Sequence, residues 1–264
     1  SKTTRRAGGR HMKGSTAESF VCFGDAHGDM CSRSTIDALE KHIAELKPKH
    51  RICLGDMFDL RSLRKGVSNQ DSEHYDSLVS DLTQGYNMLE RLRPTVFLNG
   101  NHEFRLYNTA ENAASGIVRQ YCQEGVEKLE KYLRKMGCKV YPYHYDQGVH
   151  RIGSVAFVHG YTANMAAVKQ HAEIYADPGG AVVMGHLHRI EAVQAVRHGG
   201  AKGYSYGCLA DIPKLTYASL RPATMRWSNG WVFGIVGKGK KNFKIWQAEK
   251  TNGKWILPTN LKEI

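Results

Sequence analysis

The sequence contains no long apolar run. No segment approaches the ~18 apolar residues that a membrane-spanning helix needs. The basic residues at the N-terminal end are not followed by the apolar segment of a secretory signal. We therefore expect a soluble, cytoplasmic protein that does not engage a membrane.

The cysteines lack any recognisable spacing. The chain has six cysteines among its 264 residues, and no Cys-x-x-Cys pair occurs, so neither a zinc finger nor a small disulfide framework is indicated. A chain of this length buries roughly three quarters of its unfolded surface and needs no disulfide or metal to hold its core together. We expect reduced thiols in the core, and a functional role for any metal ion.

Acidic residues are scarce at both ends of the chain. Residues 1–16 contain five basic residues and no acid, and residues 221–264 contain nine basic residues and two acids. The formal net charge of the chain is +12, and these two segments carry all of it. We predict a flexible basic arm over residues 1–16 and a single domain over residues 17–264, with a basic, strand-rich C-terminal part over residues 221–264.

This C-terminal part has two interpretations. Lysines interleaved with aromatic residues suit DNA or RNA, whose bases stack on rings and whose phosphates attract cations. Alternatively, the lysines are only solvated and the tryptophans belong to the core. The tryptophans in question are Trp227, Trp231, Trp246 and Trp255.

Apolar runs alternate with helical periodicity in the first half of the chain. Strands are predicted over residues 20–23, 51–54 and 95–98, and helices over residues 34–46, 71–92 and 110–136. After residue 141 the pattern predicts one helix, over residues 164–175. It predicts strands over residues 149–152, 155–158, 181–184, 191–196, 204–206, 231–236 and 243–247. This order is typical of an α/β domain with a strand-rich second half.

Five of the predicted strands end in a polar cluster. The clusters are Gly24-Asp25-Ala26-His27-Gly28, Gly55-Asp56-Met57-Phe58-Asp59, Gly100-Asn101-His102-Glu103, His159-Gly160 and Gly185-His186-Leu187-His188. Ligands of open α/β sheets bind outside the carboxyl ends of the strands, so the five clusters are expected to meet along one edge. One such cluster alone is more often a turn, a helix cap or a buried histidine. All five in this order favour a functional site.

The donors in these clusters are carboxylates, imidazoles and one amide, without a thiolate. This set suits hard or borderline divalent ions such as Mn, Fe, Zn or Ni. About seven donors exceed a single tetrahedral site and fit two ions that share a bridging carboxylate. We expect two divalent metal ions, with manganese as the first choice.

The ordered clusters resemble those of the calcineurin-like metallophosphoesterase superfamily, over about residues 19–190. The resemblance implies a four-layer α-β-β-α sandwich of two mixed β-sheets flanked by helices, with the metal site at the carboxyl edge of the sheets. By position, it implies one ion on Asp25, His27 and His188, a second on Asn101, His159 and His186, and Asp56 as the bridge.

The resemblance also implies a reaction. A hydroxide that bridges the two ions attacks phosphorus, while His102, oriented by Asp59, protonates the leaving group. Arg105 and Arg61 follow these residues closely and are placed to bind phosphate oxygens. Solvation or salt bridging is the alternative role for both arginines.

Two branches of the superfamily share features with this chain. Residues 24–28 and Glu103 look like Ser/Thr phosphoprotein phosphatases, but that branch has Arg-Gly where this chain has Leu60-Arg61. The pair His186 and His188 is similar to phosphodiesterases and nucleases, including Mre11-like nucleases and small phage and bacterial phosphoesterases. We expect a phosphodiesterase that acts on nucleic acid or nucleotide-like diesters. The alternatives are a phosphomonoesterase, such as a phosphoprotein phosphatase, and a non-catalytic scaffold of the same fold.

Two segments near the expected site are also of interest. Residues 141–145 are rich in aromatic side chains, and either line the mouth of the site or pack as an ordinary loop. Residues 61–70 are polar and are predicted to form a mobile loop beside the site.

Overall fold

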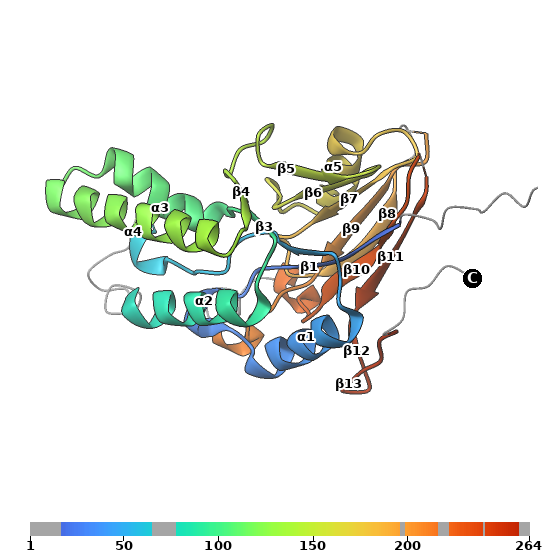
Figure 1. Cartoon of the computed structure of the whole chain (residues 1–264), viewed down its shortest axis with the longest axis horizontal. Coiled ribbons are helices and arrows are strands. Elements are labelled where there is room, and N and C mark those ends of the chain that lie inside the picture. Colours follow the sequence, from blue (N-terminus) through green and yellow to red (C-terminus); the bar gives the residue numbers. More distant parts are fainter. Residues whose placement is uncertain (1–16, 65–77, 196–198, 216–221, 240, 259–264) are drawn as a thin grey trace, which may run out of the picture.

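The computed structural model of the chain describes residues 17–64, 78–195, 199–215, 222–239 and 241–258. Two β-sheets stack face to face, and helices pack on the outer face of each sheet (Figure 1). This arrangement confirms the four-layer sandwich of two mixed sheets. The predicted arm over residues 1–16 and most of the predicted loop over residues 61–70 lie outside the described residues.

The first sheet has six strands in the order β11-β10-β1-β2-β3-β4. Four strands run parallel: β1 (Glu18–Phe23), β2 (His50–Cys53), β3 (Val96–Leu98) and β4 (Lys139–Tyr141). Two antiparallel strands, β10 (Trp231–Val236) and β11 (Phe243–Ala248), continue the sheet beyond β1. Strand β4 was not predicted, because its partly exposed residues form no apolar run.

The second sheet has five strands in the order β5-β6-β7-β9-β8. Its parallel strands are β6 (Val155–Val158), β7 (Ala181–Met184) and β9 (Lys202–Tyr206). The edge strands β5 (Val149–Ile152) and β8 (Ile190–Gln194) are antiparallel to their neighbours. A small hairpin of β12 (Lys250–Thr251) and β13 (Lys254–Trp255) follows β11.

Most helices lie on the side of the first sheet. These are α1 (Arg33–Leu46), α2 (Leu78–Leu92), α3 (Asn101–Asn112) and α4 (Gly116–Lys135), whereas α5 (Ala167–Tyr175) covers the second sheet. Short 3-10 turns are η1 (Gly28–Met30), η2 (Arg61–Leu63), η4 (Ile212–Lys214) and η6 (Pro222–Arg226). Within the described ranges, we find no helix with the length and apolar character to cross a bilayer.

The single helix predicted over residues 110–136 is wrong, because the chain forms two helices there. It leaves helical geometry at Ala113 and starts again after Ser115, whose Oγ accepts a hydrogen bond from the Val118 amide at 3.5 Å. Helix α3 already begins at Asn101, where the Glu103 carboxylate accepts a hydrogen bond from the Gly100 amide at 2.8 Å. Of the helix predicted over residues 71–92, the structure describes residues 78–92.

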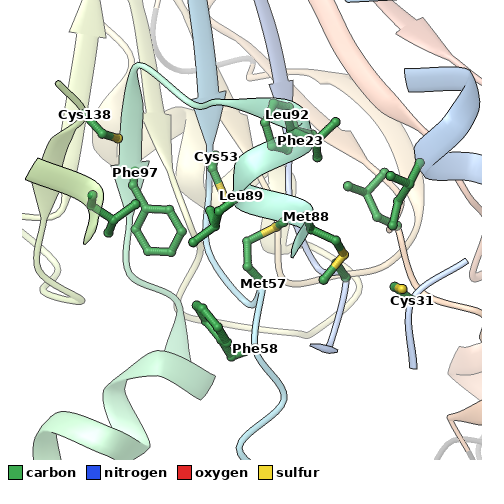
Figure 2. Close-up of a cluster of buried hydrophobic side chains, with 14 of the residues drawn as sticks. Phe23, Cys31, Cys53, Met57, Phe58, Met88, Leu89, Leu92, Phe97 and Cys138 are labelled. Atoms are coloured by element: carbon green, nitrogen blue, oxygen red, sulfur yellow. The ribbon is translucent and has the colours of Figure 1, made fainter. Parts of the chain in front are cut away.

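Three apolar cores separate the four layers. Figure 2 shows the core between the first sheet and its helices, to which Phe58, Leu89 and Phe97 belong. Between the two sheets, Phe20 meets Phe157 edge-on with ring centroids 5.0 Å apart, and a third core around Val168 joins the second sheet to α5. All six cysteines are free and buried, as predicted.

The two ends of the sandwich carry different side chains. Strands β1, β2, β3, β6 and β7 all lead into the polar clusters at one edge. Strand β10 runs in the opposite direction to β1, so Val236 pairs with Glu18, and the turn with Lys238 and Lys241 lies at the other edge. The six residues of β1 separate the two edges by roughly 20 Å.

Candidate metal centre

The polar clusters meet at the carboxyl edge of the two sheets. Three groups of donor atoms lie within 4.8 Å of one another. Asp25, His27 and His188 form the first, Asp56, His159 and His186 form the second, and His27, Asp56 and His102 form a third that connects them. Asn101 adjoins the second group, with its Oδ1 2.9 Å from His159 Nε2. The structure thus brings together all seven residues that were predicted as ligands.

Most of these residues have an unusual backbone conformation. Positive φ angles between 50° and 69° occur at Asp25, His27, Asp56, His186 and His188. Non-glycine residues rarely adopt this left-handed region, and such strain gathers at functional sites. Here it turns each loop sharply at the end of its strand. Aspartate and histidine are among the few residues besides glycine that are enriched at positive φ.

The first group is compact and buried. His27 Nε2 lies 3.0 Å from His188 Nε2, which lies 3.3 Å from Asp25 Oδ1. The other nitrogen of His27, Nδ1, lies 2.9 Å from Asp59 Oδ1, so the hydrogen bond to this carboxylate directs Nε2 toward the group. His188 Nδ1 is buried and has no hydrogen-bond partner among the described residues.

The second group is built in the same way around Asp56. His159 donates from Nδ1 to the carbonyl of Leu54, which leaves Nε2 3.4 Å from Asp56 Oδ2. Asp56 Oδ1 accepts a hydrogen bond from the His102 amide at 2.9 Å. The Oδ2 atom of Asp56 therefore faces the interior of the site and is available to be shared.

The charges of the site attract cations. Burial would raise the pKa of the Asp56 carboxyl, but the imidazoles of His159 and His102 hold it well below its usual range. Burial would lower the pKa of His159, yet the carboxylates of Asp56 and Asp25 raise it to about 9. Inward-facing imidazoles held by buried carboxylates are a donor set that fits divalent ions.

His102 lies beside both groups and is held by Asp59. Its Nδ1 donates to the backbone carbonyl of Asp59 at 2.7 Å and lies 3.2 Å from Asp59 Oδ1. Its Nε2 lies 3.9 Å from Asp56 Oδ2. The pKa of His102 is raised: burial opposes protonation, but the charge of Asp56 and the Asp59 hydrogen bond outweigh burial.

The two predicted phosphate-binding arginines differ. Arg61 forms a bidentate salt bridge to Asp29, with distances of 2.8 and 3.1 Å, which is the structural alternative considered for it. Arg105 donates to the Asp59 carbonyl at 2.9 Å, and its Nη2 lies 3.1 Å from His102 Nε2. Arg105 is therefore the one of the two that lies next to the candidate acid.

Two buried carboxylates to which sequence analysis assigned no role hold the loops in place. Glu103 accepts hydrogen bonds from the amides of four residues at 2.8 to 3.1 Å: Asp56, Met57, Phe58 and Gly100. Asp81 of α2 accepts from the amides of Asp59 at 2.8 Å and Leu60 at 2.6 Å. Glu103 stood within a recognised cluster, whereas Asp81 had no sequence signal, because its partners are 21 and 22 residues away.

Tyr206 of β9 also escaped sequence analysis. It is fully buried, and its hydroxyl donates to Asp25 Oδ2 at 2.8 Å. The only signal was its position at the end of a predicted strand. Burial, followed by the charge of Asp25, raises the pKa of its hydroxyl well above the usual value, so it stays a donor.

The aromatic residues divide between core and site. Trp231 is fully buried, which confirms the core interpretation for this residue, and its ring is tilted against that of Trp255. Trp246 stacks on Phe233, but Trp246 and Trp255 are only partly buried, and Lys244 and Lys250 lie over their rings. Trp227, in contrast, meets His188 edge-on with ring centroids 4.4 Å apart. In the aromatic loop over residues 141–145, Tyr143 lies 5.8 Å from the His159 ring.

Comparison with known proteins gives one match in sequence and several in structure. The sequence profile of calcineurin-like phosphoesterases matches residues 19–202, a segment that contains all five polar clusters. No curated protein sequence matches the chain.

The similarities among solved structures are weak. A metallophosphoesterase from Sphaerobacter thermophilus is similar with a TM-score of 0.45 and 13% identity, over 88% of each chain. Vacuolar protein sorting 29 from Cryptosporidium parvum has a TM-score of 0.42 and 13% identity, over 91% of this chain and 95% of that chain. The phosphoesterase Yfce from E. coli has a TM-score of 0.40 and 16% identity, over 88% of this chain and 98% of that chain.

Proposed function

Because the chain belongs to the calcineurin-like phosphoesterase family, we propose that it is a phosphodiesterase that uses two divalent metal ions. Its proposed substrates are nucleic acid or nucleotide-like diesters. The observation that carries the proposal is the pair of adjacent donor groups, one of which contains Asp56, next to a histidine held in place by Asp59.

Seven side chains would hold the ions. Asp25, His27 and His188 would bind one ion, Asn101, His159 and His186 the other, and Asp56 both. When bound, two such ions generate a nucleophile from water at neutral pH and withdraw charge from the phosphoryl oxygens. The oxygen and nitrogen donors suit manganese, which we propose as the native metal, over iron, zinc or nickel.

His102 is the proposed general acid. Asp59 engages its Nδ1, so the proton for the leaving oxygen is transferred from Nε2. Arg105, whose guanidinium lies 3.1 Å from this nitrogen, would bind the phosphate oxygens next to it. Both His102 and His27 donate a hydrogen bond to Asp59, which couples the position of the acid to that of the first proposed ion.

The charge around the site favours a diester over a monoester. Arg61 is engaged by Asp29, so of the two arginines Arg105 alone contacts the candidate acid. A diester carries one negative charge fewer at neutral pH than a monoester dianion, and needs fewer cations outside the metal centre. This difference supports the phosphodiesterase over a phosphoprotein phosphatase.

Turnover of paired substrates tests the proposal. After reconstitution with Mn²⁺, the protein should hydrolyse bis-p-nitrophenyl phosphate faster than p-nitrophenyl phosphate, and should cleave single-stranded DNA or RNA or small nucleotide diesters. Chelator-treated protein is the control and should be inactive. A strong preference for the monoester, with the diesters intact, would identify a phosphomonoesterase instead.

A further inference from the structure

A groove runs along one face of α3, away from the candidate metal centre. Its volume is about 480 Å³, within the range of roughly 300–1,000 Å³ found for small-molecule sites. Leu63 of η2 closes one side, and the remaining lining residues come from a single face of the helix: Phe104, Arg105, Asn108, Thr109, Asn112 and Ala113.

The groove adjoins the candidate general acid through Arg105. Arg105 belongs to its lining, and the Nη2 atom of Arg105 lies 3.1 Å from His102 Nε2. A leaving oxygen that takes its proton from His102 must come within hydrogen-bond distance of Nε2. A leaving oxygen at that position would lie next to Arg105, at the end of the groove.

The lining of the groove offers one cation, two amides and one ring. Phe104 is 44% exposed, and Arg105 is the sole charged side chain among the lining residues that the structure describes. Asn112 Nδ2 donates to the carbonyl of Asn108 at 3.1 Å and to Asn108 Oδ1 at 3.2 Å. Within the described chain, this leaves the amide nitrogen of Asn108 and the amide oxygen of Asn112 without a partner.

This chemistry suits a nucleoside. An exposed ring can stack on a base, and one free donor and one free acceptor can pair with the edge of a base or with sugar hydroxyls. A longer polyanion would need further cations along its path, and here Arg105 provides one.

We propose that the groove binds the leaving group of the substrate and that this leaving group is a nucleoside. The proposal rests on the proposed function, in which His102 protonates the leaving oxygen. Phe104 stacks on the base, Asn108 and Asn112 bind its edge or the sugar, and Arg105 holds the phosphate at the entrance of the groove.

The test is the double variant Asn108→Ala/Asn112→Ala with two diester substrates. One is a dinucleoside monophosphate, whose leaving group is a nucleoside, and the other is methyl p-nitrophenyl phosphate, whose leaving group has no sugar or base. Loss of two hydrogen bonds should lower the ratio of the two kcat/KM values about tenfold. Most of this change should come from KM for the dinucleoside, because the contacts also form in the ground state.

Gln120→Ala is the matched control, since it removes an exposed amide from α4, outside the groove, and should keep the ratio unchanged. Alanine favours the helix at all three positions, and circular dichroism verifies the fold. An unchanged ratio in the double variant, while the wild type cleaves both diesters, would overturn the assignment of the groove. Failure of the wild type to cleave any diester would contradict the proposed function itself.

Discussion

The two sheets contribute different chemistry to the same edge of the sandwich. The loops of the first sheet supply the carboxylates of Asp25 and Asp56, the amide of Asn101 and the imidazole of His27, whereas the second sheet supplies imidazoles only, from His159, His186 and His188. Each donor group combines side chains from both sheets. The site therefore exists only when the apolar core between the sheets has formed and fixed their relative position.

The sheets also support their ligands differently. On the side of the first sheet, two helix residues hold the backbone of the loops: Glu103 of α3 accepts hydrogen bonds from four backbone amides, and Asp81 of α2 accepts from two. The second sheet instead reaches across to the first, where the Tyr206 hydroxyl meets Asp25. A substitution should thus have its largest effect at a residue proposed to bind both ions. It should have a smaller effect at a residue that supports a single donor group, and the smallest effect away from the metal centre.

The largest effect is expected from Asp56→Asn, which changes the carboxylate proposed to bind both ions. We expect affinity for both ions to fall by more than about 100-fold, beyond what outer hydrogen-bond partners of ligands contribute. Elemental analysis of protein dialysed against limiting Mn²⁺ measures this. Asp177→Asn, an exposed site, serves as the control. Full occupancy in Asp56→Asn would exclude a bridging role.

His102→Ala should separate metal binding from proton transfer. We expect both ions to be retained and turnover of a diester with a poor leaving group to fall roughly 10²–10⁴-fold, the usual contribution of general acid catalysis. A p-nitrophenyl leaving group needs no proton, and its release should fall much less. Equal losses on both substrates, measured by steady-state kinetics, would remove the proton-transfer role from His102.

Tyr206→Phe should show how far the second sheet supports the first. The change removes only the hydroxyl that donates to Asp25 at 2.8 Å. Since outer hydrogen-bond partners tune metal ligands, we expect the affinity for one ion to fall about 10-fold. Titration calorimetry with Mn²⁺ measures this, and Tyr204→Phe on the same strand is the control. No change in affinity would leave Tyr206 with a packing role alone.

His150 allows a test of the contact between the two sheets away from the metal centre. Its Nδ1 bonds to the hydroxyl of Tyr141 in the first sheet at 3.0 Å, and burial lowers its pKa to about 4. In the unfolded state His150 has its ordinary pKa of 6.5, so it takes up a proton there at a higher pH than in the folded state. The free energy of unfolding therefore decreases as the pH falls from about 6.5 to about 4. Allowing for partial exposure, the loss should be about 2 kcal/mol or less.

Urea unfolding between pH 7 and pH 4 checks this prediction. The variant His150→Gln should lose less stability than the wild type over that range, whereas His144→Gln on the neighbouring loop should follow the wild type. Parallel curves for His150→Gln and the wild type would show that His150 does not titrate in this way.

The smallest effect concerns the basic turn at the edge opposite the metal centre. We propose that Lys238, Lys240 and Lys241, together with residues 1–16, bind DNA or RNA by phosphate contacts. Replacing the lysines with glutamine and removing residues 1–16 should flatten the salt dependence of DNA binding by about 0.9 in slope per lost phosphate contact. Hydrolysis of bis-p-nitrophenyl phosphate should not change when Lys238 and Lys241 alone are replaced, because these two residues lie at the opposite edge, roughly 20 Å from the site. An unchanged salt slope would leave these residues as solvated charges.

Much of the fold was predictable because strands that are covered on both faces are apolar throughout. Strands β6 and β7, with every residue buried, were predicted to the residue, and so was the end of α1 at Leu46. The break between α3 and α4 was missed, because the apolar spacing continues across Ala113 while the backbone does not. Strand β4 was missed because its exposed edge carries no periodic pattern.

By itself, the sequence determined the residue types of the site, their order and their place at the ends of five strands, because each cluster directly follows its own apolar run. Tertiary structure alone decided the pairings: Arg61 with Asp29, Arg105 with His102, Tyr206 with Asp25, and the basic turn at the far edge. These depend on strand direction, on sheet stacking and on contacts between residues far apart in the chain. Local sequence does not encode such contacts, since they arise only when the two sheets pack together.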